Sequence, residues 1–148
     1  MKIADIYKGK SLTTSFEVFP PNDKVGLDQV YNCLDVLSLE KPDYISVTYG
    51  AGGNTKGRTV EIADRIKNQN GVESVAHLTC IGAKKEEIDR VLEDLEKHNI
   101  ENILALRGDY PVDRELEVGD FSYARDLINY IHEKKDDKFS IGAAYYVE

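Results

Sequence analysis

The stretch VESVAHLTCIGAKKEEIDRVLEDLEKHNIENILALRGD, residues 72–109, carries the pattern that decides the fold. Its first and last parts, Val72–Leu78 and Asn102–Leu106, are short and mostly apolar, as expected of buried strands. Between them, over Lys84–His98, apolar residues recur at helical spacing among charged positions: Ile88, Val91, Leu92 and Leu95. The stretch therefore predicts a strand, a helix that covers the sheet, and a second strand.

The same alternation continues toward the amino terminus. After a short polar lead, Thr14–Phe19 is predicted to be a strand that ends at Pro20 and Pro21. Asn22 or Asp23 can cap the following helix, whose apolar face is formed by Leu27, Val30, Tyr31, Leu34 and Leu37. Tyr44–Thr48 is the second predicted strand, and a glycine-rich loop leads from it to a helix over Arg58–Gln69.

Toward the carboxyl terminus, Pro111–Gly119 is predicted to be a polar loop. Asp120 or Ser122 can then cap a helix with Tyr123, Leu127, Ile128 and Ile131 on its apolar face, and Ser140–Tyr145 is the fifth strand. The whole chain, 1–148, thus forms one α/β domain with parallel strands and right-handed crossovers.

Two architectures fit five parallel strands. A length of 148 residues favours an open flavodoxin-like sheet, whereas a (βα)8 TIM barrel would be present only as its first five strands and four helices. Strand alternation favours the barrel, because Ser15 and Glu17 lie opposite Phe16 and Val18 on the first strand. A barrel lumen gives such polar residues a place, while a sheet covered by helices on both faces has less room for them.

Composition and charge exclude several classes of protein. Twenty-seven acidic and 19 basic residues give a net charge of −8, which disfavours nucleic acid as a partner. No apolar run reaches the roughly 20 residues that span a bilayer, and the start MKIADIYKGK lacks a signal peptide's apolar block, so we expect a cytoplasmic chain. Cys33 and Cys80 match no zinc spacing and are predicted to be reduced core thiols, with no metal.

Polar or aromatic residues end all five predicted strands, where α/β proteins bind ligands: Glu17, Thr48 with Tyr49, His77, Arg107 to Asp109, and Tyr145. Each has a structural alternative. Glu17 could be a surface carboxylate on an edge strand, His77 a hydrogen-bonded core residue, and Asp109 the cap of a turn. The loop 50–59 follows a strand but fits neither a dinucleotide fingerprint nor a P-loop, in which Arg58 would replace the phosphate lysine.

The ordered motifs SFEVFPP, ISVTYGAGG, AHLTC, ILALRGDYP and IGAA resemble the amino-terminal part of the methylenetetrahydrofolate reductase catalytic barrel. The resemblance implies reduction of 5,10-methylenetetrahydrofolate to 5-methyltetrahydrofolate, with electrons from NADH or NADPH passing through FAD. It makes Glu17 the general acid that protonates a folate nitrogen, and Asp109 the carboxylate that stabilises the resulting cationic iminium. The FAD contacts that it implies are Thr48, Tyr49, Ala51, His77, Arg107, Gly108, Asp109, Tyr123, Ala124 and Tyr145.

The chain departs from the family at its end. It reads GAAYYVE where the family usually continues as AA-x-YPE or AAYPE, so either Tyr145 or Tyr146 could take the flavin position. Three of eight barrel strands are missing, so we expect the exposed edges to favour a homo-oligomer or completion by another segment. A flavin- or nucleotide-binding module without folate chemistry of its own is the alternative function.

Overall fold

The computed structural model describes residues 1–21, 23–49, 56–110 and 118–145. Its strands are β1 (Ser15–Val18), β2 (Tyr44–Val47), β3 (Glu73–Thr79), β4 (Asn102–Leu106) and β5 (Ser140–Ala143). Its helices are α1 (Ile3–Gly9), α2 (Lys24–Leu39), α3 (Lys56–Asp64), α4 (Lys85–Lys97) and α5 (Ala124–Lys135), and α3 continues into a π-helical turn, η1 (Arg65–Gln69). The predicted alternation of strands and helices is confirmed, and β4 has the predicted bounds.

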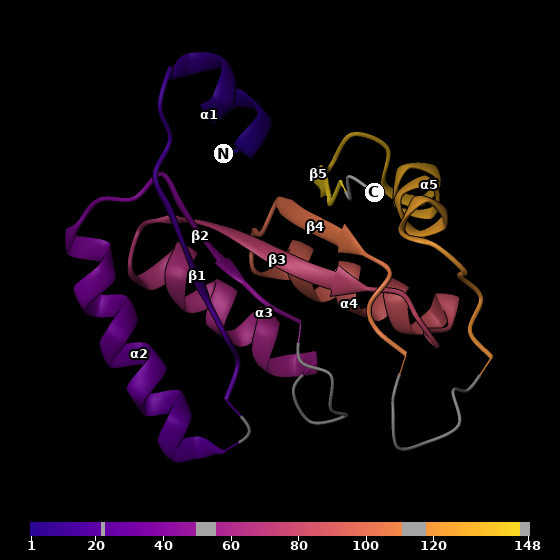
Figure 1. Cartoon of the computed structure of the whole chain (residues 1–148), viewed down its shortest axis with the longest axis horizontal. Helices are drawn as coiled ribbons and strands as arrows, with labels where there is room; N and C mark the ends of the chain where they lie inside the picture. The colour runs from indigo at the N-terminus through magenta and orange to yellow at the C-terminus, as the bar shows by residue number, and fades with distance from the viewer. Residues whose placement is uncertain (22, 50–55, 111–117, 146–148) are drawn as a thin grey trace.

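The five strands form one parallel sheet in the order β1-β2-β3-β4-β5 (Figure 1). A flavodoxin-like sheet would have the order 2-1-3-4-5, with helices on both faces, so that alternative is wrong. When each strand pairs with the next in the chain, right-handed crossovers place every connecting helix on the same face. This is how a (βα)8 barrel is built, and the chain has the architecture of a partial barrel.

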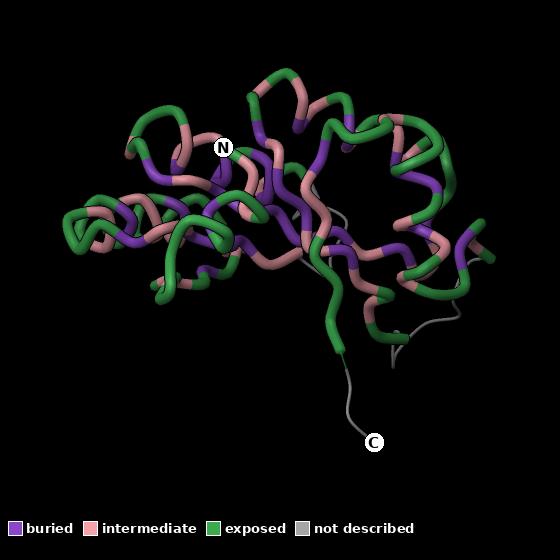
Figure 2. Tube along the Cα trace, turned by 90° about the horizontal axis from the view of Figure 1, so that it is seen from above, coloured by how far each residue is buried: buried purple, intermediate pink, exposed green. Residues whose placement is uncertain are grey.

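The hydrophobic core lies between the sheet and these crossover helices. Helix α3 packs on β2 and β3, and α5 packs on β4. The strands contribute alternate residues, including Val18, Ile45, Val47, Leu78 and Ile103, and the helices contribute Leu34, Ile62, Leu92 and Leu127. Figure 2 shows the buried residues concentrated along the middle of the molecule. The predicted division of β1 is confirmed, since Val18 and Phe16 face this core while Glu17 does not.

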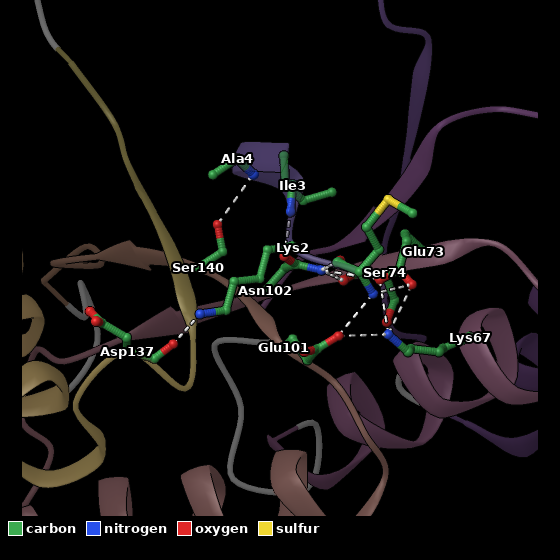
Figure 3. A network of polar contacts seen from close by, with 11 residues as sticks. Lys2, Ile3, Ala4, Lys67, Glu73, Ser74, Glu101, Asn102, Asp137 and Ser140 are labelled. Atoms are coloured by element: carbon green, nitrogen blue, oxygen red, sulfur yellow. Dashed lines mark hydrogen bonds and ion pairs between the residues drawn. The ribbon is translucent and has the colours of Figure 1, made fainter. Parts of the chain in front are cut away.

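Helix α1 is a finding that the sequence did not predict, because its segment was interpreted as a polar lead. It lies at the end of the sheet where the strands begin (Figure 1). Its start is held by the first residues of three strands: Ile3 N–H donates to Asn102 Oδ1 at 2.8 Å, Ala4 N–H to Ser140 Oγ at 3.4 Å, and the Met1 ammonium to Glu73 at 2.8 Å (Figure 3). The segment thus closes the amino-terminal end of the polar sheet face.

Asn102 organises that closure from inside the protein. It is 1% exposed, and besides accepting from Ile3 it donates to the Met1 carbonyl at 3.1 Å and to the Ser74 carbonyl at 3.2 Å. Lys67 completes the charge balance nearby, since its ammonium contacts Glu73 at 2.9 Å and Glu101 at 3.5 Å. One buried amide therefore ties the amino-terminal segment to β3 and β4.

Two local predictions are wrong. The N-cap of α5 is Tyr123 rather than Asp120 or Ser122, and Tyr123 is 61% exposed rather than on the apolar face. Asp120 instead accepts from Lys85 N–H at 2.9 Å at the start of α4, and Asp126 accepts from Tyr123 N–H at 2.9 Å. Within the described residues, no helix is long and apolar enough to cross a membrane.

The two cysteines differ. Cys33 is exposed on α2, so its predicted place in the core is wrong. Cys80 is buried as predicted, and burial raises the pKa of its thiol to about 11, so that this thiol stays protonated near neutral pH.

Replacing Asn102 by alanine should lower the free energy of unfolding by about 2 kcal/mol, because it leaves the part-buried Ile3 N–H and the buried Ser74 carbonyl without their partner. Urea unfolding followed by circular dichroism measures the difference. The exposed Asn129→Ala variant on α5 is the matched control and should stay within about 0.5 kcal/mol of the wild type. Equal stabilities of the two variants would contradict the role given to Asn102.

Candidate active site

The polar face of the sheet, opposite the crossover helices, brings Glu17, Ser46 and His77 together. Glu17 and Ser46 are register partners on β1 and β2, and the Ser46 hydroxyl donates to Glu17 Oε2 at 3.2 Å. His77 of β3 places Nε2 3.4 Å from the same carboxylate oxygen. The sequence named Glu17 and His77 separately, and the structure makes them neighbours.

These three residues differ in their access to solvent. Ser46 and His77 are 8% and 7% exposed, whereas the Glu17 side chain is 48% exposed. Burial lowers the pKa of His77, and the Glu17 carboxylate opposes that shift. The imidazole is therefore favoured in its neutral form beside a carboxyl group that solvent or a ligand can reach.

A cavity of about 420 Å³ opens on this face. Glu17, Ser46, Val75, His77 and Leu104 line its wall from four strands, and Tyr7 of α1 and Tyr44 of β2 line it toward the amino-terminal end. The Tyr7 and Tyr44 hydroxyls bond each other at 2.8 Å. The cavity thus has a polar wall of hydroxyl, carboxyl and imidazole groups over an apolar base.

Arg107, Gly108 and Asp109 follow β4 directly, at the carboxyl end of the sheet. Arg107 and Asp109 are exposed, and the Arg107 guanidinium lies 5.2 Å from the centre of the Tyr110 ring. Gly108 has a φ of +86°, which favours glycine, and a Cβ there would come within 2.9 Å of Ile81 and 3.0 Å of Thr79. The turn therefore requires glycine, and it presents a cation and an anion on either side of it.

Thr48 and Tyr49 follow β2, but only one of them belongs to the polar face by strand alternation. Thr48 comes two residues after Ser46, while the Tyr49 side chain packs toward α4 beside Ala83, Ile88 and Val91. Burial and the carboxylate of Glu87 raise the pKa of Tyr49 to about 12. A contact from Tyr49 to a ligand on the polar face would have to use its backbone.

The remaining predicted contacts are more scattered. Ala124 is the first residue of α5, Tyr123 precedes it, and Tyr145 lies beyond the end of β5 with 87% exposure. Ala51 and Tyr146 lie outside the described residues. The structure therefore gathers Glu17, His77 and the end of β2 on one surface, with the 107–109 turn at the same end of the sheet.

Strand alternation predicted Ser46 on the same face as Glu17, and the hydrogen bond between the two side chains confirms that placement. Arg58, which the sequence places where a P-loop would need its lysine, donates from Nη1 to the backbone carbonyls of Pro21 and Asp23. Over the described ranges, no cluster of three or more His, Cys, Asp or Glu residues could hold a metal ion.

Comparison with known proteins identifies the relatives of this chain. The family model described as methylenetetrahydrofolate reductase matches residues 2–148. Methylenetetrahydrofolate reductase (NADH) 1 of Arabidopsis thaliana is 41% identical over 157 residues, which cover 100% of this chain and 26% of that protein. The 5,10-methylenetetrahydrofolate reductase of Escherichia coli is 38% identical over 137 residues, covering 93% of this chain and 45% of that protein. The chain thus spans less than half the length of these relatives.

Replacing Gly108 by alanine should destabilise the fold by about 2 kcal/mol, because the left-handed turn and the contacts with Ile81 and Thr79 both oppose a Cβ. Gly57→Ala is the control, since nothing lies within 4 Å of a Cβ there and Gly57 lies in α3. Thermal unfolding of the two variants should separate them, with Gly57→Ala at least as stable as the wild type. A Gly108→Ala variant as stable as the wild type would refute the strained turn.

Proposed function

The chain belongs to the methylenetetrahydrofolate reductase family, and we propose from that membership that it is the amino-terminal part of an enzyme that reduces 5,10-methylenetetrahydrofolate to 5-methyltetrahydrofolate. The observation that carries the proposal is Glu17 on the polar face of the sheet, next to Ser46 and His77 and open to the cavity. A proton donor for a folate nitrogen needs both a fixed carboxyl group and access to substrate. Glu17 has both.

Two carboxyl groups would take two roles. Glu17 would donate the proton that opens the five-membered ring of the folate, and its half-exposed side chain leaves room for that approach. Asp109 would contribute its carboxylate from the exposed turn after β4, where a negative charge can stabilise a cationic iminium form of the substrate. The protein would supply the proton donor and the stabilising negative charge. Hydride chemistry would come from FAD when it is bound.

The residues at the carboxyl ends of the strands suit an FAD site in part. Arg107 is an exposed guanidinium able to pair with a pyrophosphate, and Gly108 brings the backbone of the turn close to β3. Thr48 can donate from the polar face. The Tyr49 ring fits less well, since it points toward α4.

NADH is the favoured electron donor, because the relatives from Arabidopsis thaliana and Zea mays are both named methylenetetrahydrofolate reductase (NADH) 1. The second candidate function is a flavin- or nucleotide-binding module without folate chemistry of its own. It is supported by the turn after β4, where the exposed Arg107 guanidinium lies beside Gly108 at the carboxyl end of the sheet. We also propose a cytoplasmic location and a barrel completed by a further segment or by a second copy.

Titration of the chain with FAD, followed by flavin absorbance and fluorescence, should give saturable binding that Arg107→Ala weakens about tenfold or more, as expected for the loss of a charge-assisted contact. Arg90→Ala is the control, because that guanidinium bonds to the Glu86 carbonyl on its own helix, and it should bind as the wild type does. A folded chain that does not bind FAD would rule out a flavin site in this segment.

Turnover separates the two candidate functions. Glu17→Gln should reduce the formation of 5-methyltetrahydrofolate at least about 100-fold while FAD binding is unchanged, because the amide keeps the shape of the side chain but cannot donate the proton. Glu93→Gln, on the exposed side of α4, should retain the wild-type rate. FAD binding without turnover by the wild-type chain would favour the binding module.

A further inference from the structure

His77 carries one of the few buried side-chain polar atoms without a hydrogen-bond partner among the described residues, and it is the one that lies beside Glu17 in the cavity wall. The residue is 7% exposed, and its Nε2 is buried with no hydrogen-bond partner in the part of the chain that the structure describes. Buried polar atoms are nearly always paired, because leaving one unpaired costs about 1–3 kcal/mol. An unpaired ring nitrogen in the wall of a cavity is therefore a candidate for a functional role.

The nearest charged group to that atom is the carboxyl group of Glu17. Nε2 lies 3.4 Å from Oε2, which is close enough for an ion pair, although the hydrogen-bond geometry is not met. A small rotation of the half-exposed Glu17 side chain would align the two groups, and catalytic hydrogen bonds are often long before a substrate binds. The two residues can therefore exchange a proton without any change in the backbone.

Ser46 restricts that rotation. The Ser46 hydroxyl lies 3.2 Å from Glu17 Oε2 and 3.4 Å from the Phe16 carbonyl. Ser46 is buried on β2, the strand next to β1. Both the hydroxyl and the imidazole therefore meet the same oxygen of the carboxyl group. Oε1 takes part in neither of these two contacts.

The electrostatic surroundings of the pair are simple. The other ionisable side chains that line the cavity are Tyr7 of α1 and Tyr44 of β2, and their mutual hydrogen bond together with burial raises the pKa of Tyr7 to about 12. Strands β4 and β5 contribute no ionisable side chain to the described lining, and β3 contributes His77 alone. Glu17 is thus the one carboxylate in that lining that can govern the charge of His77.

We propose that His77 is the positioning residue of Glu17: together with the Ser46 hydroxyl it fixes Oε2, and it shares one proton with the carboxyl group, so that Glu17 and His77 act as a single acid. The inference rests on the proposed role of Glu17 as the proton donor and adds a regulator of its charge. When Glu17 is protonated, neutral His77 accepts a hydrogen bond from it. When Glu17 has given its proton to a substrate, the new carboxylate favours protonation of His77 by a proton that solvent supplies through the open cavity. That solvent proton then passes from His77 Nε2 to Glu17 Oε2 and restores the acid for the next turnover.

The proposed pair makes a prediction about the pKa of His77. Burial lowers the pKa of the imidazole, and the Glu17 carboxylate works in the opposite direction. Removing the charge of Glu17 should therefore lower the pKa of His77 further, whereas a histidine that is merely buried would titrate unchanged. The measurement needs neither FAD nor folate, so its result is independent of whether the chain reduces anything.

The experiment follows the imidazole resonances of the whole chain by two-dimensional NMR as pH is varied. His98 and His132 serve as internal references, because His98 lies beside Asp94 on α4 and His132 lies on α5, both away from the cavity lining. In Glu17→Gln, the proton affinity of His77 should fall about tenfold or more while the two references stay where they are. An unchanged His77 titration in a folded Glu17→Gln chain would overturn the proposal.

Ser46→Ala provides a second variant that keeps both members of the pair. Loss of the hydroxyl removes the competing donor and leaves Oε2 to His77 alone, so the proton affinity of His77 should rise, by a smaller factor than it falls in Glu17→Gln. If Glu17→Gln fails to fold, this variant decides: an unchanged His77 titration would refute the positioning role. A shifted titration in a chain that shows no turnover would leave the pair standing and would tell against the proposed enzymatic function alone.

Discussion

The handedness of the crossovers constrains everything else in this structure. Each strand pairs with the next strand in the chain, so each right-handed connection returns to the sheet from the same side. The apolar faces of α2 to α5 consequently all pack against one face of the sheet. Leu34, Ile62, Leu92 and Leu127 are buried there. The opposite face receives no crossover helix and can carry polar residues that a doubly covered sheet could not accommodate.

That polar face is closed at one end and open at the other. At the amino-terminal end, the buried Asn102 amide and the carboxylates of Glu73 and Glu101 bind the first residues of the chain, so that α1 covers this end of the sheet. At the carboxyl end, the strands lead into exposed turns such as Arg107 to Asp109. The contacts that hold the amino-terminal segment and the exposed turns therefore lie at opposite ends of the same sheet. Barrels of this type bind their ligands at the end with the exposed turns.

The sequence predicted those elements whose apolar pattern is local, and it failed where distant contacts decide. The bounds of β4 and the face of α4 follow from periodicity, because Ile88, Leu92 and Leu95 are buried by the sheet that they cover. Helix α1 has Ile6 as its one buried residue and is held by Asn102, almost a hundred positions away, so no local pattern could reveal it. The Asp120 carboxylate can cap a helix, but it accepts from Lys85 N–H at the start of α4 and does not cap α5, which follows it in the chain.

The candidate site shows the same limit in a sharper form. Glu17 and His77 were each recognisable from their positions at strand ends, yet their proximity depends on register across an intervening strand. Glu17 pairs with Ser46, and Ser46 pairs with Val75, so His77 reaches the carboxyl group diagonally from two residues further along β3. A shift of one residue would turn His77 to the core, because alternate residues of a strand face opposite sides. The contact between Glu17 and His77 therefore depends on the same register that buries Ile45 and Ala76, and the core and the candidate site are specified together.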